Sequence, residues 1–508
     1  MKYLLKWYVV CLLPMAGTVN SARSDTREGH VSAHKAVHLV QTQLQAEPSG
    51  DALSAVRTDR VSKLWDHGKL QVSDNRRYVE HTDGTPFLWI GDTAWQLFYR
   101  LKSRDVGGND LEKYFGNRVE RGFTVIQAVL IDELDYKSGK GCAENGSMPL
   151  TDRDPTRRVD SYWQWVDYVI SRAEDHGIYM CLLPCWGNWV NNEAIFDSLN
   201  AYDYGRFLGE RYADRPNIIW MLGGDREVNA GQKVIWNSMA KGIKDQTGTR
   251  QLITFHPRGA KSSSEVFHTE SWLDFNTYQS GHAIDEPNVW QLALRDVQRT
   301  PAKPTLNSEP GYEGIVSRFW ESCDNAVLTD YDVRKDAYRS LFSGAWGHTY
   351  GHSSIWQMLR PGDKPAACAD TDVPWHHAIE WEGAAQMIHV ARLLKSRPAH
   401  RWTDESLIVE GLGSGSTRMG ASRGENFALI YFPASMTRSI ATDKISGDRV
   451  TCYWFDPRNG ASTPIGTFAK SGDHRFTTPD NLDWVLVIDD AGAGFHPPGT
   501  DDLWYSQP

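Results

Sequence analysis

Short apolar runs alternate with amphipathic stretches along residues 87–395. The apolar runs have the length of buried strands, and the stretches between them repeat apolar positions every three to four residues, as helices on a sheet do. Strands are predicted at 87–90, 124–131, 179–183, 218–222, 252–255, 275–278, 304–307 and 349–356. Helices are predicted at 111–121, 161–176, 194–212, 231–246, 289–297, 333–345 and 379–395.

Eight strands with intervening helices favour an α/β fold of the (β/α)₈ TIM barrel type over a doubly wound sheet. The connection at 259–274 is the shortest in the series. We place the barrel domain at residues 60–398, with a hairpin of 70–72 and 77–79 before its first strand. After residue 398 the helical period ends and apolar residues alternate in strand fashion. A small all-β sandwich is therefore predicted at 399–508.

The first 22 residues have the pattern of a secretory signal peptide. Lys2 and Lys6 precede an apolar run at 7–15, and small residues follow. Residues 23–59 are polar and are interpreted as a linker whose composition is compatible with disorder. A secreted or periplasmic protein is predicted, and no later run has the length of a membrane span.

The amino-acid composition limits the classes of molecule that the protein is expected to bind. The chain of 508 residues has a formal net charge of −10 and no basic stripe, which argues against nucleic acid. Aromatic residues make up 11%, with 21 Trp, a composition that suits either core packing or stacking on sugar rings. An oligosaccharide or polysaccharide is the expected partner, and no oligomeric state is predicted.

Seven cysteines become six once Cys11 leaves with the leader, which allows disulfides in an oxidising compartment. Cys323 and Cys368 are predicted to pair, whereas Cys181 and Cys185 lie on one strand and its exit and are not expected to pair with each other. The sequence holds no CxxC or HExxH motif. No metal or cofactor is predicted.

Polar and aromatic residues close the predicted strands, and in a barrel the carboxyl ends of the strands carry the active site. Each of these residues has a packing or hydrogen-bonding role as its alternative. The candidate substrate-binding residues are Asp92, Trp95, Gln127, Trp186, His256, Tyr278, His352 and Trp356.

Two carboxylates stand at the ends of the fourth and seventh strands. Asp225 follows Gly223 and Gly224, and Glu309 precedes a Pro-Gly turn. Retaining glycoside hydrolysis needs a protonated acid and an ionised nucleophile about 5–5.5 Å apart. Asp225 is assigned as acid/base and Glu309 as nucleophile, with Glu227 as an alternative acid and a structural ion pair or helix cap as the alternative role of Asp225.

A metal-dependent hydrolase is a different interpretation, with His256, His352 and Asp92 as ligands. No two of them share a short ligand spacing, and the carboxylate pair would then have no role.

Four motifs in order carry a family resemblance. They are FLWIGDTAW (87–95), RGFTVIQAVL (121–130), NIIWMLGGDRE (217–227) and PTLNSEPGYEG (304–314). With them the chain resembles the apiosidase-like (β/α)₈ domain of glycoside hydrolase family 140, and the C-terminal segment resembles the collagen-binding-like β-sandwich that follows that barrel. The resemblance implies cleavage of an apiose linkage in rhamnogalacturonan II side chains of pectin, with Asp225 and Glu309 catalytic.

Related barrel hydrolases usually carry Asn-Glu at the end of the fourth strand, whereas this chain has Gly-Asp, a departure that favours the narrower family. A second functional hypothesis is a carbohydrate-binding protein whose barrel is not catalytic. Release of sugar from pectin-derived side chains or aryl glycosides distinguishes the two.

Overall fold

The computed structural model describes residues 63–133, 143–369, 373–470 and 472–505. The predicted leader at 1–22 and the predicted linker at 23–59 lie outside the described residues. Within the described part, one sheet joins nine strands in the order β8-β7-β6-β5-β4-β12-β11-β10-β9. Their bounds are β4 (Ile90–Thr93), β5 (Val125–Val129), β6 (Tyr179–Leu183), β7 (Ile218–Gly223), β8 (Ile253–His256), β9 (Lys261–Ser262), β10 (Asn276–Gln279), β11 (Thr305–Glu309) and β12 (Gly347–Tyr350).

Eight of these strands run parallel, and only β9 pairs in the antiparallel sense. The two ends of the parallel set meet between β8 and β10. There the Asp274 amide donates to the Ile253 carbonyl at 2.9 Å, and the Thr254 hydroxyl donates to the Phe275 carbonyl at 2.7 Å. These contacts bring the sheet to a nearly closed barrel, so the predicted TIM-barrel fold is confirmed.

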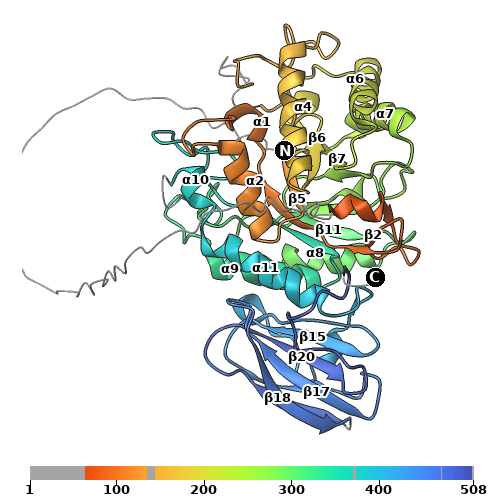
Figure 1. The fold of residues 1–508 in the computed structure, drawn as a ribbon, viewed down its shortest axis with the longest axis vertical. Helices are drawn as coiled ribbons and strands as arrows, with labels where there is room; N and C mark the ends of the chain where they lie inside the picture. The colour runs from red at the N-terminus through yellow and green to blue at the C-terminus, as the bar shows by residue number, and fades with distance from the viewer. Residues whose placement is uncertain (1–62, 134–142, 370–372, 471, 506–508) are drawn as a thin grey trace, which may run out of the picture. The chain divides into compact units, whose positions relative to one another are not determined.

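Helices cover the outside of the barrel, as Figure 1 shows for α2, α4, α6 and α7. Each turns an apolar stripe toward the strands, because apolar residues recur at the helical period. Their bounds are α1 (Leu97–Arg100), α2 (Asp110–Glu120), α4 (Asp160–Asp175), α5 (Asn188–Asn191), α6 (Ser198–Tyr212), α7 (Ala230–Thr247), α8 (Asn288–Val297), α9 (Asp330–Phe342), α10 (Trp375–Ala378) and α11 (Glu382–Lys395).

Three differences between the predicted and observed elements concern the barrel strands and the fifth connection. The first barrel strand is β4, whereas residues 86–87 form β3 (Pro86–Phe87) in a separate sheet. There β3 pairs with β2 (Val79–His81), and β2 pairs with β1 (Leu70–Val72). The last barrel strand is shorter than predicted, because the chain turns after Tyr350. The short fifth connection holds β9 and the 3₁₀ turn η2 (Ser263–Glu265) in place of a full helix.

The C-terminal region is all-β, as predicted. One six-stranded sheet has the order β13-β14-β15-β20-β17-β18, and β16 pairs with β19. Apolar residues of both layers are buried together, among them Trp454 from the six-stranded sheet and Ile440 and Phe476 from the two-stranded sheet. The strands are β13 (Trp402–Thr403), β14 (Gly420–Arg423), β15 (Phe427–Phe432), β16 (Thr437–Ala441), β17 (Arg449–Phe455), β18 (Ser462–Ala469), β19 (Asp473–Thr477) and β20 (Trp484–Asp490).

Helix α9 joins the barrel to this β-domain through buried contacts. Arg334 binds both carboxylate oxygens of Asp483 at 2.9 Å, and the Tyr431 hydroxyl donates to the same carboxylate at 2.9 Å. The rings of Tyr338 and Tyr431 stack with centroids 5.0 Å apart. Both members of this bidentate ion pair are buried, so the pair is stable only when the guanidinium and the carboxylate meet in one geometry. The pair therefore fixes the orientation of α9 relative to the β-domain.

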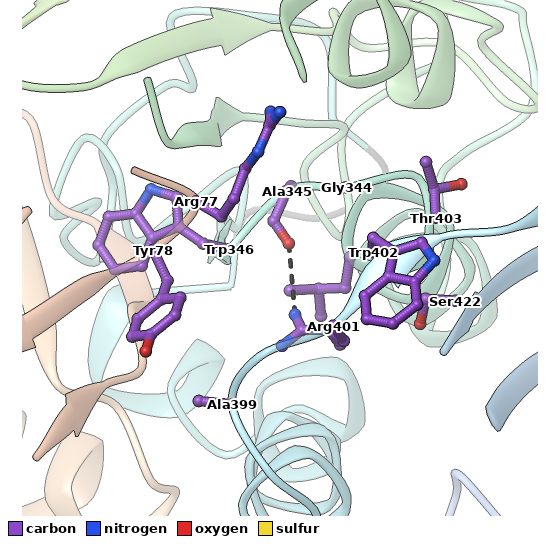
Figure 2. A pocket seen from close by; sticks show the side chains of 11 residues that line it. Arg77, Tyr78, Gly344, Ala345, Trp346, Ala399, Arg401, Trp402, Thr403 and Ser422 are labelled. Carbon is purple, nitrogen blue, oxygen red and sulfur yellow. Dashed lines mark hydrogen bonds between the residues drawn. The ribbon is translucent and has the colours of Figure 1, made fainter. Parts of the chain in front are cut away.

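A small cavity lies between β-domain residues and the barrel, lined by Arg77, Trp346, Arg401 and Trp402 among others (Figure 2). Its volume is about 20 Å³. That is room for roughly one water molecule and far too little for a sugar ring. The chemistry must therefore be sought elsewhere, at the carboxyl ends of the barrel strands.

The disulfide prediction is confirmed for Cys323 and Cys368, which are bonded with their Cα atoms 5.5 Å apart. The bond joins the segment after β11 to the segment after β12. Among the described cysteines, Cys181, Cys185 and Cys452 are unpaired and buried. Burial in apolar surroundings makes those three thiols core groups.

Candidate active site

The last residue of β7 and the two residues that follow it have positive φ angles. The φ angles are 91° at Gly223, 131° at Gly224 and 48° at Asp225. A Cβ on Gly224 would lie 2.7 Å from the Trp186 ring, and one on Gly223 would lie 2.4 Å from the His256 carbonyl oxygen. Only glycines allow this close approach, and the sharp turn presents the Asp225 carboxylate at the barrel mouth.

Glu309 is the last residue of β11, and its carboxylate is held from several sides. The Tyr312 hydroxyl donates to Oε1 at 2.5 Å. Nε2 of His282 lies 3.5 Å from the same oxygen, and Nε2 of His256 lies 2.9 Å from Oε2. The Trp95 indole N–H donates to the Tyr312 hydroxyl at 3.1 Å, which leaves the Tyr312 proton directed at Glu309.

Asp225 and Glu309 differ in exposure. The Asp225 side chain is 42% exposed, whereas that of Glu309 is 6% exposed. Nη1 of Arg226 lies 3.4 Å from Oδ2 of Asp225, and Nη2 of Arg226 donates to Glu133 at 3.0 Å. Asp225 is thus open to solvent and to an arriving substrate, while Glu309 is fixed inside the protein.

The two carboxyl groups have opposite pKa shifts. Although solvent reaches the Asp225 carboxyl group from one side, the protein around it replaces much of its hydration. This desolvation and then the charge of Glu309 raise the pKa of Asp225, and Arg226 and His256 only partly oppose the shift. Burial alone would raise the pKa of Glu309, but hydrogen bonds and charge from His256 and His282 outweigh it and hold that pKa well below its usual range. One group is therefore suited to keep a proton and the other to stay ionised.

Aromatic rings surround this pair. The centroid of Trp95 lies 5.3 Å from that of Trp186 and 5.4 Å from that of His256, and Trp186 lies 5.7 Å from His256. Trp95 and Trp186 are 4% and 9% exposed. The structure therefore brings together Asp225, Glu309, Trp95, Trp186 and His256, five of the residues predicted from the sequence.

Gln127 and Trp356 lie next to this group. The Gln127 amide donates to the Ser308 carbonyl at 3.0 Å inside the barrel, directly beside Glu309 in the chain. Trp356 is half-buried and packs against the cluster that contains Tyr312. Gln127 is thus part of the floor, and Trp356 part of the surrounding wall.

Three predicted binding residues point elsewhere, so their assignment is corrected. Oδ2 of Asp92 is fully buried and accepts from Tyr114 at 2.7 Å and from Arg118 at 3.2 Å, both on α2. The Tyr278 hydroxyl donates to the Val289 carbonyl of α8 at 2.9 Å. Successive strand residues face opposite sides of the sheet, and these two face the helices.

The third is His352, whose Nδ1 accepts from the Ser354 amide at 2.9 Å while its ring packs on Trp381 at 4.5 Å. Burial lowers its pKa to about 3. Since both His352 and Asp92 are engaged away from His256, the three do not form the metal site of the alternative interpretation. No group of three such ligands with metal-binding geometry occurs among the described residues.

Glu227, the alternative acid, forms an ion pair with Arg258 and has a side chain 67% exposed. It has no recorded contact with Glu309 within the described residues. Asp225, by contrast, is coupled to Glu309 by charge. The geometry favours Asp225 as the partner carboxyl group.

Two residues of the site were not predicted. His282 lies three residues beyond the end of β10, and Tyr312 lies three residues beyond Glu309. Both lie in the loops that follow the strands, beyond the residues that close them. Tyr312 belongs to the PGYEG turn, so the motif was an available signal for it, whereas nothing in the pattern around His282 marks it.

Comparison with known proteins identifies the family. The model of the "Apiosidase-like, catalytic domain" matches residues 73–401, well over half of the chain. The chain belongs to the apiosidase-like family. In this apiosidase-like protein, residues 403–489 also match the model described as "Putative collagen-binding domain of a collagenase". The two matches confirm the predicted resemblance to an apiosidase-like domain followed by a collagen-binding-like domain.

Solved structures agree with the assignment. One described as "Glycoside hydrolase" is 32% identical with a TM-score of 0.78, covering 85% of this chain and 99% of its own. A glycoside hydrolase family 5 protein from Bacteroides vulgatus is 30% identical with a TM-score of 0.80, covering 87% and 98%. No curated protein matches the sequence. The apiosidase-like protein is therefore a glycoside hydrolase.

Proposed function

We propose that this glycoside hydrolase cleaves its substrate with retention of configuration, with Asp225 as acid/base and Glu309 as nucleophile. The observation that carries the assignment is the opposite direction of the two pKa shifts around His256. A protonated acid beside an ionised carboxylate is the state from which retaining hydrolysis starts.

The reaction proceeds in two steps. The Asp225 proton goes to the glycosidic oxygen as the bond to the anomeric carbon breaks, and the Glu309 carboxylate forms a bond to that carbon. Water then gives a proton to Asp225 and attacks the same carbon, which releases Glu309 as a carboxylate. Tyr312, His256 and His282 stabilise the charge that returns to Glu309.

The proposed substrate is an apiose-containing side chain of the pectic polysaccharide rhamnogalacturonan II, and the proposed location is outside the cytoplasm. The family match supports the first proposal. The predicted leader and the Cys323–Cys368 disulfide support the second, because disulfides persist in oxidising compartments. Among the described residues, no helix combines the length and the apolar character needed to cross a bilayer.

Proton NMR of the reaction with rhamnogalacturonan II oligosaccharides tests the proposal. We expect release of apiose-linked products whose first-formed anomer matches the substrate. First formation of the opposite anomer would overturn the retaining mechanism. Hydrolysis of other plant oligosaccharides but not of apiosides would overturn the substrate and leave the mechanism standing.

A further inference from the structure

Trp320 is the most exposed tryptophan of the described residues, with 42% of its surface open to solvent. It lies in the segment that follows β11, on the side of the barrel where the strand delivers Glu309. A large apolar ring left in water costs free energy, and a ligand that covers the ring removes that cost.

The segment that carries Trp320 is held firmly. The Arg318 amide donates to the His282 carbonyl at 2.8 Å, and the Val316 amide donates to the Cys368 carbonyl at 3.0 Å. The Cys323–Cys368 disulfide closes the segment three residues after Trp320. The exposed ring is thus mounted on a fixed support.

A series of ring contacts connects Trp320 to the nucleophile. Trp320 packs on Phe319 with centroids 5.3 Å apart, and Phe319 lies 6.1 Å from His282. His282 in turn packs on Tyr312 at 4.4 Å, and Tyr312 donates to Glu309. Trp320 is therefore the outer member of a row of rings that begins at the reacting carboxylate.

We propose that Trp320 is a sugar-binding platform for a ring of the substrate glycan that lies outside the scissile linkage. This inference rests on the proposed function in that it takes a glycan as the ligand. The flat apolar indole suits the C–H face of a sugar ring, and its rigid mounting lowers the entropy cost of binding. Trp320 thereby selects longer substrates without acting on the bond itself.

The test compares Trp320→Ala with the parent enzyme on two substrates, an aryl apioside and a rhamnogalacturonan II side-chain oligosaccharide. We expect KM for the oligosaccharide to rise roughly five- to tenfold, the size of one aromatic stacking contact, with the aryl apioside unaffected. Trp320→Phe keeps a ring and should recover most of the affinity. Tyr168→Ala is the matched control, because Tyr168 is 47% exposed on α4.

A second measurement is independent of turnover. Binding of a panel of plant cell-wall oligosaccharides to Glu309→Gln and to the Glu309→Gln, Trp320→Ala double variant is followed by calorimetry. Equal affinities of these two variants for every oligosaccharide would overturn the platform. An equal rise in KM for the aryl apioside and the side-chain oligosaccharide in the kinetic test would overturn it as well. Binding through Trp320 by a parent protein that hydrolyses nothing would overturn the proposed function and leave the platform standing, and absence of all glycan binding would overturn both.

Discussion

Nε2 of His256 lies 2.9 Å from Oε2 of Glu309, while Nδ1 of the same ring accepts the Asp225 backbone N–H at 3.5 Å. One imidazole thus joins the backbone of the proposed acid to the carboxylate of the proposed nucleophile. The two groups are positioned by a shared neighbour as well as by their own strands.

Replacing the two carboxylates should give different defects. Glu309→Gln removes the nucleophile, and we expect turnover to be lost while the melting temperature is kept. Asp225→Asn removes the proton donor and should lower kcat/KM roughly 10²- to 10⁴-fold for the oligosaccharide. The loss should be much smaller for aryl glycosides, whose leaving groups need little protonation. Full activity in Glu309→Gln would refute the nucleophile assignment.

The pH dependence of kcat/KM should be bell-shaped. The proposed mechanism requires ionised Glu309, whose pKa is lowered, and protonated Asp225, whose pKa is raised. The acid limb therefore reports Glu309 and the alkaline limb reports Asp225. Because the negative charge of Glu309 raises the pKa of Asp225, Glu309→Gln should lower the Asp225 pKa in an NMR titration. An unchanged or higher value would show that the two groups are not coupled.

The contact between His256 and Glu309 can be tested with His256→Asn. Hydrogen bonds to charged groups contribute about 1.5–3 kcal/mol, so kcat/KM should fall roughly 10- to 100-fold. The acid limb of the pH profile should also move to higher pH, because Glu309 loses a group that lowers its pKa.

His352→Asn is the matched control for this experiment. His352 is also a buried histidine at a strand end but packs on Trp381 outside the site. The control should lower stability without moving the acid limb. A shift of equal size in both variants would assign the effect on His256 to general loss of packing.

The strands and the carboxylate pair were predictable because both follow from local pattern. Apolar runs of strand length end at Asp225 and Glu309, and glycines before one and Pro-Gly after the other mark the turns. The same rule failed for Asp92 and Tyr278, because a position near a strand end does not say which face the side chain takes. A shift of one residue along the strand turns a side chain from the barrel mouth to the surrounding helices.

The loop residues could not be predicted from periodicity. His282 reaches Glu309 because the chain after β10 folds back over the site, a path set by tertiary contacts such as the bond from Arg318 to the His282 carbonyl. The exposure of Trp320 likewise depends on how the segment after β11 is anchored. Sequence reasoning therefore identified the proposed carboxylate pair and missed part of what holds the two groups in place.

Glu313 gives a prediction about stability. It is 3% exposed, and its carboxylate accepts from the Tyr350 hydroxyl at 2.5 Å and from the Gly383 amide at 3.2 Å. Burial raises its pKa to about 7 from an ordinary value of 4.5, although both hydrogen bonds oppose the shift. The folded state therefore binds this proton more tightly than the unfolded state does.

For a group whose pKa is raised by folding, the contribution to stability is fully present below the unfolded pKa and is lost as pH rises through the folded value. Between pH 4.5 and 7 the protein should lose up to about 3 kcal/mol of unfolding free energy through Glu313. The side chain in Glu313→Gln cannot ionise. The unfolding free energies measured by urea denaturation at pH 5 and pH 8 should therefore differ less in this variant than in the parent. Asp336, with a pKa raised by burial to about 7, contributes in the same direction, so Asp336→Asn should reduce the difference further. If Glu313→Gln keeps the full pH dependence, the buried carboxyl group is not its source.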